Sequence, residues 1–164
     1  MSYISNHKLE IICDTERVKC FRLYDPKKPE SNMMTTYFTF NPYGILINGD
    51  YTASPNADIC NFKSLEWFLG DLPPDYLAEK FQIERKFDPE YAKRFLEELK
   101  EEDEEIAIFI EEFIYENEYE FFRFLSDQYP DCIVDLHFPR EKGAVERLSQ
   151  LQKQFAKAYK ELYE

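Results

Sequence analysis

The first fifty residues contain three segments with the apolar and polar pattern of β-strands. Residues 18–24 (VKCFRLY) alternate with a period of two, as in a strand with one buried face. Residues 33–40 (MMTTYFTF) are rich in threonine and aromatic residues, which fit a pleated surface. Residues 41–44 (NPYG) read as a turn, because proline presets φ and glycine accepts a positive φ. With residues 44–50 (GILINGD) as the return strand, the sequence predicts an antiparallel hairpin at 33–50.

After residue 60 the pattern changes from strands to helices. Short helices are expected over 64–70 (SLEWFLG) and 75–81 (DYLAEKF), the first opened by a capping residue and the second by two prolines. Asp88 is a typical N-cap and Pro89 a typical first helical residue, so a longer helix is expected over 88–100.

Two further apolar stripes with helical spacing follow. They predict a helix in the region 101–125, where the stripe resumes one turn after Asn117, and a last helix over 144–162. Residues 132–136 form a short candidate strand between them. The apolar positions of the first stripe are Ile106, Phe109, Ile110, Phe113, Ile114, Phe121, Phe124 and Leu125. Those of the last helix step by three and four residues, the spacing of a helix-packing seam, and are Leu148, Leu151, Phe155, Ala158 and Leu162.

A run of strands followed by a run of helices is typical of an α+β fold. The sequence predicts an N-terminal antiparallel sheet of three to four strands followed by a mostly helical, acidic C-terminal half. At 164 residues the chain is expected to form a single domain over 1–164, mainly β in 1–60 and mainly α in 61–164.

Charge narrows the classes of partner. The chain has 33 acidic and 20 basic residues, a net charge of −13, and 44% hydrophobic residues, which is too apolar for a disordered acidic tail. Direct binding to nucleic acid or to an anionic membrane is not expected, because both need lysine and arginine to displace counterions. With no apolar run of about 18 residues and no signal-peptide layout, a cytoplasmic location is expected.

Motifs for catalysis, metal binding and cofactor binding are missing from the sequence. Four glycines make neither a phosphate-binding loop nor a dinucleotide fingerprint. The two histidines, His7 and His137, show no metal-ligand spacing, and His137 with Cys132 and Asp135 is too local for a catalytic triad. We therefore expect no enzymatic activity, no metal and no cofactor. The cysteines form no CxxC pair and are expected to be free buried thiols, namely Cys13, Cys20, Cys60 and Cys132.

The acidic stretch 97–120 is the feature with functional content, because it holds 12 acidic residues and one basic residue, Lys100. Many of these acids stand at i,i+3 or i,i+4 in a helix, where like charges cost a few tenths of a kcal/mol per pair. One interpretation is a surface that binds a basic partner; the other is a solvated face that keeps an aromatic-rich protein soluble. The residues expected to bind the partner are Glu101, Glu102, Asp103, Glu104, Glu105, Glu112, Tyr115, Glu116 and Tyr119, with Phe122 as a further aromatic anchor.

Three phrases, YFTFNPYGILINGDYT (37–52), SLEWFLGDL (64–72) and DYLAEKF (75–81), together resemble a widespread group of small phage and prophage proteins. The resemblance covers about residues 18–100 and implies a viral or mobile-element origin. Anti-CRISPR proteins are similar in size, charge and lack of motifs, an analogy that implies blocking of a host enzyme. The matching positions are Gly44, Gly49, Asp50, Trp67, Phe68, Tyr76, Ala78, Glu79 and Lys80.

These observations lead to three hypotheses. The first is a phage-encoded inhibitor, active in the cytoplasm of the infected cell, whose acidic surface occludes a basic groove of a nucleic-acid-handling defence protein such as a CRISPR effector. The second is a small ligand-binding or enzymatic module, with a pocket between sheet and helices near Asp50, Trp67, Tyr76 and Glu79. The third is a phage structural or assembly protein that forms a homo-oligomer through the 144–162 helix.

Overall fold

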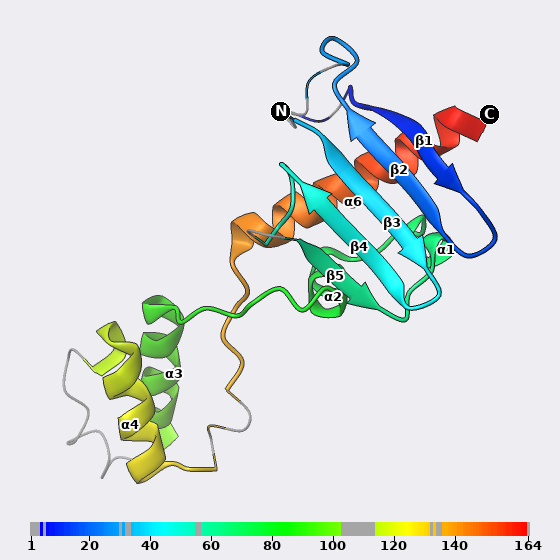
Figure 1. Ribbon diagram of the computed structural model, residues 1–164. Helices are drawn as coiled ribbons and strands as arrows, with labels where there is room; N and C mark the ends of the chain where they lie inside the picture. Colours follow the sequence, from blue (N-terminus) through cyan, green and yellow to red (C-terminus); the bar gives the residue numbers. More distant parts are fainter. Residues whose placement is uncertain are drawn as a thin grey trace. The chain divides into compact units, whose positions relative to one another are not determined.

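The computed structural model describes residues 4, 6–29, 31, 34–54, 57–102, 114–131, 133 and 136–163. The chain divides into two compact units, the first made of Met1–Glu84 with Glu141–Glu164 and the second of Arg85–Arg140 (Figure 1). Strands and helices together give the α+β class that the sequence predicts. Joint folding of the two units as a single domain 1–164 stays a prediction.

The first unit is built on an antiparallel sheet whose five strands are neighbours in sequence order (Figure 1). The predicted hairpin is confirmed: the register pairs Asn41 with Gly44 and Thr36 with Gly49. Gly44 is required here, because at φ 143° a Cβ would lie 2.1 Å from the Cys60 carbonyl oxygen. The strands are β1 (Lys8–Asp14), β2 (Lys19–Tyr24), β3 (Thr36–Asn41), β4 (Gly44–Gly49) and β5 (Asp58–Asn61).

The expected number of three to four strands is too low because the sequence patterns of β1 and β5 are weak. In β1 only Leu9 is buried, and a bulge between Ile11 and Cys13 breaks the period of two that identifies a strand. β5 has only four residues. Both are the outer strands of the sheet, where burial imposes least on the sequence.

One helix, α6 (Lys142–Tyr163), crosses one face of the sheet, and among the described residues of the first unit Figure 1 shows no helix on the other face. The predicted seam of α6 is confirmed as apolar and buried except at Leu162, which is 38% exposed. Two short helices, α1 (Leu65–Phe68) and α2 (Pro74–Lys80), complete the core on the α6 side. The seam is thus covered by the chain's own sheet and helices, which favours packing within the chain over the oligomer hypothesis.

Gln152 is a buried polar residue of α6 that ties this helix to the end of α1. Its Nε2 donates hydrogen bonds to the carbonyl oxygens of Phe68 at 2.6 Å and Gly70 at 2.9 Å. We expect Gln152→Leu to lower the free energy of unfolding by about 1–3 kcal/mol, because the buried Phe68 carbonyl loses its donor. Urea unfolding followed by circular dichroism measures this. Gln150→Leu on the exposed side of the same helix is the control and should change the value by less than about 0.5 kcal/mol.

The second unit packs two helices, α3 (Pro89–Glu102) and α4 (Glu118–Gln128), with a 3₁₀ turn, η2 (Ile114–Glu116). Its ends meet in an antiparallel bridge between Arg85 and Arg140. The buried core residues of this unit are Ala92, Leu96, Leu99, Ile114, Phe121, Leu125 and Phe138.

The structure corrects two predictions in this unit. A helix running through Asn117 is wrong, because Asn117 has extended φ and ψ and caps the start of α4 through its side chain. Of the candidate strand 132–136, Ile133 is helical and Leu136 belongs to no strand, and the remaining three positions lie outside the described residues. The stripe positions from Ile106 to Phe113 lie outside them as well.

Candidate partner-binding surface

The negative charge of the chain is concentrated in the second unit. Arg85–Arg140 holds 17 acidic and 7 basic residues, a net charge of −10 in 56 residues. The larger first unit holds 16 acidic and 13 basic residues, a net charge of −3. The unit boundary therefore separates a strongly acidic module from a nearly balanced one.

Exposed acids of this unit gather where α3 runs past η2. Glu97 and Glu101 are exposed and one helical turn apart, on the stripe that begins with Lys93. The Lys93 ammonium lies 5.6 Å from the centre of the Tyr115 ring, which brings this stripe beside η2 and its exposed Glu116. Predicted site residues from two elements, Glu101 with Tyr115 and Glu116, thus belong to one region of the unit.

The described part of α3 carries like charges one helical turn apart. Glu97 and Glu101 stand at i,i+4 and Glu98 and Glu101 at i,i+3. Each like-charge pair typically costs a few tenths of a kcal/mol, less where salt screens it. By contrast, Glu118 and Glu120 lie in the first turn of α4, where the helix dipole stabilises them. Helix stability therefore accounts for the acids of α4 and not for those of α3.

The two predicted aromatic anchors on α4 differ in exposure. Tyr119 is 70% exposed, and the Arg123 guanidinium lies 6.0 Å from its ring centre while pairing with Glu120 at 2.6 Å. Phe122 is instead half-buried and packs edge-on against Phe121 and Phe138. The ring of Phe122 thus packs on the core of its own unit, and its role as an anchor for a partner stays a prediction.

Part of the predicted site lies outside the described residues, namely Asp103, Glu104, Glu105 and Glu112. Glu102 is described as part of α3 without its side chain. Within the described part of the acidic stretch 97–120, three exposed acids were not among the predicted site residues, namely Glu97, Glu98 and Glu118. Charge density along the sequence is the signal that identifies them.

A notch of about 230 Å³ opens on α3 beside these acids, lined by Tyr91, Arg94, Phe95 and Glu98. Tyr91 and Phe95 make its apolar wall by packing against Phe138 and Phe121. With one guanidinium (Arg94) and one carboxylate (Glu98) among its four lining residues, the notch carries no net charge that favours a basic ligand.

The front-half pocket predicted near Asp50, Trp67, Tyr76 and Glu79 is not assembled as expected. Trp67 and Tyr76 do meet, with ring centres 6.3 Å apart. Asp50 instead accepts a hydrogen bond from the Met34 amide, and its own amide donates to the Thr35 carbonyl. Both of these partners lead into β3, so Asp50 has the structural role of closing a turn.

Lysine ammonium groups lie against the rings of both Trp67 and Tyr76. Lys63 lies 5.4 Å from the Trp67 ring centre, Lys80 lies 5.1 Å from that of Tyr76, and Lys80 pairs with Glu79 at 2.6 Å. The pairing with Glu79 raises the pKa of Lys80, so this amine is protonated at neutral pH and does not serve as a base.

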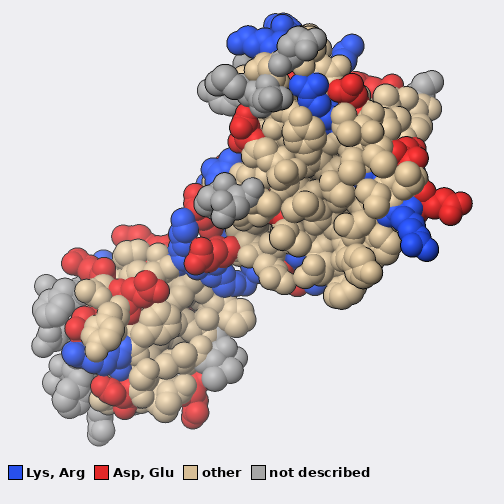
Figure 2. Space-filling model, viewed as in Figure 1, with Lys and Arg blue, Asp and Glu red and all other residues tan. Residues whose placement is uncertain are grey.

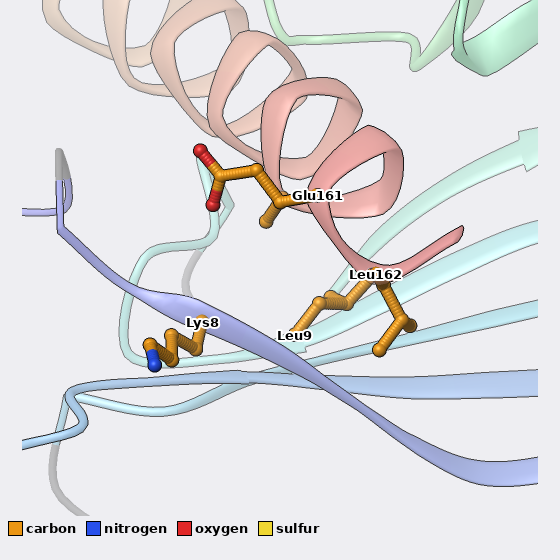
Figure 3. A pocket seen from close by; sticks show the side chains of 5 residues that line it. Lys8, Leu9, Glu161 and Leu162 are labelled. Carbon is orange, nitrogen blue, oxygen red and sulfur yellow. The ribbon is translucent and has the colours of Figure 1, made fainter. Parts of the chain in front are cut away.

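A second cavity, of about 260 Å³, lies between β1 and the end of α6 (Figure 3). It is lined by Lys8, Leu9, Ala158, Glu161 and Leu162. Figure 3 shows the carboxylate of Glu161 and the amine of Lys8 pointing away from each other. A cavity with two charged groups that do not converge gives no acid–base pair for catalysis.

In the part of the chain that the structure describes, no group of three or more His, Cys, Asp or Glu side chains is placed to hold a metal ion. Over the same residues, no helix combines the length and apolar composition needed to cross a membrane.

Comparison of the chain with models of known protein families, with curated proteins and with solved structures finds no match.

Proposed function

We propose that this chain is a phage-encoded binding inhibitor, without enzymatic activity, that blocks a nucleic-acid-handling defence protein of the host, such as a CRISPR effector. The acidic unit Arg85–Arg140 would occupy the basic groove that normally holds nucleic acid. The observation that carries the proposal is the net charge of −10 on this compact unit. Like-charged acids one turn apart on α3, which helix stability disfavours, support it.

Binding of this kind follows from long-range attraction and a few aromatic contacts. A groove lined with lysine and arginine attracts the acidic unit and raises the association rate, as it does for its nucleic acid. Tyr119, 70% exposed beside the charged Arg123 and Glu120, supplies an aromatic contact of the kind that carries binding energy. An interface of standard size, about 1,600 Å² in total, is sufficient for a stable complex.

Affinity capture with competition tests the proposal. The full chain is immobilised and exposed to nuclease-treated lysate of the bacterial host at about 0.05 M salt, and bound proteins are identified by mass spectrometry. We expect a nucleic-acid-binding protein that an excess of duplex DNA releases, because the DNA and the chain compete for one groove. Release by about 1 M salt is also expected, because the Debye length falls to about 3 Å there.

Two outcomes contradict the proposal. One is that no nucleic-acid-binding protein is recovered even at low salt. The other is that the captured protein stays bound in the presence of excess duplex DNA, which places its contact with the chain outside the nucleic-acid site. Resin prepared in the same way without the chain is the background control.

A further inference from the structure

Two of the free cysteines face each other across neighbouring strands. The register of β1 and β2 pairs Cys13 directly with Cys20, next to the pair Asp14 and Lys19. Both thiols are free and half-buried. Side chains of directly paired residues in an antiparallel sheet point to the same face, so the two sulfurs lie on one side of the sheet.

That side of the sheet is the face opposite α6. The register continues the pair across the sheet in one row, from Cys20 to Thr39, from Thr39 to Leu46 and from Leu46 to Ile59. Ile59 is 54% exposed, and the Cys20 thiol donates to the Thr39 hydroxyl at 3.5 Å. Figure 2 shows this face as a mostly uncharged surface, open to solvent. Small thiol reagents therefore reach the row from outside.

The backbone geometry permits a covalent bond between the two sulfurs. Directly paired residues of an antiparallel ladder have Cα atoms about 4.5 Å or about 5.5 Å apart, depending on the hydrogen-bond pattern. Disulfides span Cα separations of about 4.4–6.8 Å. Both ladder distances fall inside this range. Closure requires both thiols to rotate away from their hydrogen bonds, which Cys13 Sγ donates to the Val18 carbonyl at 3.8 Å and Cys20 Sγ donates to the Thr39 hydroxyl at 3.5 Å.

Cys60 shows how an unreactive thiol of the same protein is placed. It is 1% exposed in the core of the first unit, and burial raises the pKa of its thiol. A buried thiol with a raised pKa supplies little thiolate, the form that reacts. Cys60 is therefore an internal reference for the pair on the open face.

We propose that Cys13 and Cys20 form a dithiol oxidation site, which a low-molecular-weight disulfide such as oxidised glutathione converts into an intrachain disulfide between β1 and β2. One cysteine thiolate attacks a sulfur of the oxidised glutathione, and one glutathione leaves as thiolate. The second cysteine thiolate attacks the protein sulfur of this mixed disulfide, and the second glutathione leaves. Two electrons pass from the protein dithiol to the glutathione disulfide, and the two thiol protons pass to the departing thiolates.

A disulfide between Cys13 and Cys20 would link β1, the outermost strand of the sheet, covalently to β2. β1 is an edge strand with a bulge between Ile11 and Cys13, a position where a sheet opens easily. The bond would close the short loop from residue 13 to residue 20 and restrict the unfolded chain. The inference concerns the first unit and is independent of the inhibitor proposed for the second.

Peptide mapping of the full chain tests the site. The reduced protein is equilibrated with oxidised and reduced glutathione, quenched with acid, alkylated and digested with trypsin without reduction. Arg17 and Lys19 lie between the two cysteines, so trypsin separates them unless they are bridged. We expect the linked peptides LEIICDTER and CFR, lighter by two hydrogen atoms than the separate thiols, and a thermal midpoint about 5 °C above that of the reduced chain.

Single variants supply the controls. Cys13→Ser and Cys20→Ser should each stop at one bound glutathione on the remaining cysteine and lose the shift in midpoint, whereas Cys60→Ala should keep the bridge. The proposal is overturned if the wild-type chain, shown by circular dichroism to be folded, ends with glutathione on separate cysteines. Bridges that use Cys132 or join two chains in place of the 13–20 link also overturn it.

Discussion

Phe155→Ala is expected to lower the free energy of unfolding of the first unit by about 3–5 kcal/mol. Phe155 is fully buried in α6, and its ring packs against those of Phe21, Phe38, Phe40 and Phe68 with centres 4.4–5.5 Å apart. Removal of the ring leaves a cavity among side chains from two strands and two helices, so no single element can move to fill it. Because small proteins are stable by about 5–15 kcal/mol, the loss is large enough to shift the urea midpoint clearly.

Phe62→Ala is the matched control, because Phe62 is the same residue type at 84% exposure and should change stability by less than about 0.5 kcal/mol. Phe121→Ala, the corresponding cavity in the second unit, tests the predicted single domain. If 1–164 unfolds as one cooperative domain, both variants lower the same transition. Two transitions, each lowered by one variant only, would contradict the single domain. A loss below about 1 kcal/mol for Phe155→Ala would contradict its role as the centre of the core.

The hairpin and the last helix could be predicted because the residues that are buried in the structure follow the apolar spacing seen in the sequence. In β3 and β4 a proline–glycine turn and apolar strands agree on one register, which the structure pairs from Thr36 to Asn41. The seam of α6 identifies the helix and its buried face. The sheet that covers this seam could not be read from the helix, since any apolar surface of the right shape satisfies the same spacing.

β1 and the Cys13–Cys20 pair were missed for a single reason. The strand KLEIICD has one buried residue and a bulge, so neither alternation nor burial marks it. Unless β1 is recognised as a strand, a spacing of seven residues between two cysteines does not indicate that they are paired. The turn between β1 and β2 determines this pairing. Thr15 and Val18 are hydrogen-bonded across it, and a tight turn centred on residues 16–17 places residue 13 opposite residue 20.

The acidic site could be predicted in charge and only partly in geometry. The distribution of charge along the chain identifies the acidic half, and the structure places a net charge of −10 on one compact unit. The cap at Asn117 was missed because an asparagine inside an apolar stripe fits the exposed side of a helix as well as an N-cap. Sequence spacing also could not show that Phe122 faces its own core, since half-buried positions border both faces of a helix.

Reversal of three acids in the second unit is expected to slow association with the captured host protein tenfold or more at about 0.05 M salt. Glu98, Glu101 and Glu116 are exposed, and their replacement by lysine changes the net charge from −13 to −7. Attraction across an interface acts mainly on the association rate, so repulsion at the groove appears there first. The folded state should keep or gain stability, because Glu97 and a lysine at 101 attract each other one turn apart on α3.

A second triple variant separates local charge from total charge. Glu16, Asp71 and Glu146 are exposed acids of the first unit, and their replacement by lysine gives the same net charge of −7. Surface plasmon resonance against the captured protein, at about 0.05 M and about 1 M salt, should show a slowed rate only for the second-unit triple, with the difference fading at high salt. If both triple variants slow association equally, the total net charge and not the position of the acids sets the association rate. Unchanged binding by a folded second-unit triple would leave the acids of α3 and η2 as a solvated face.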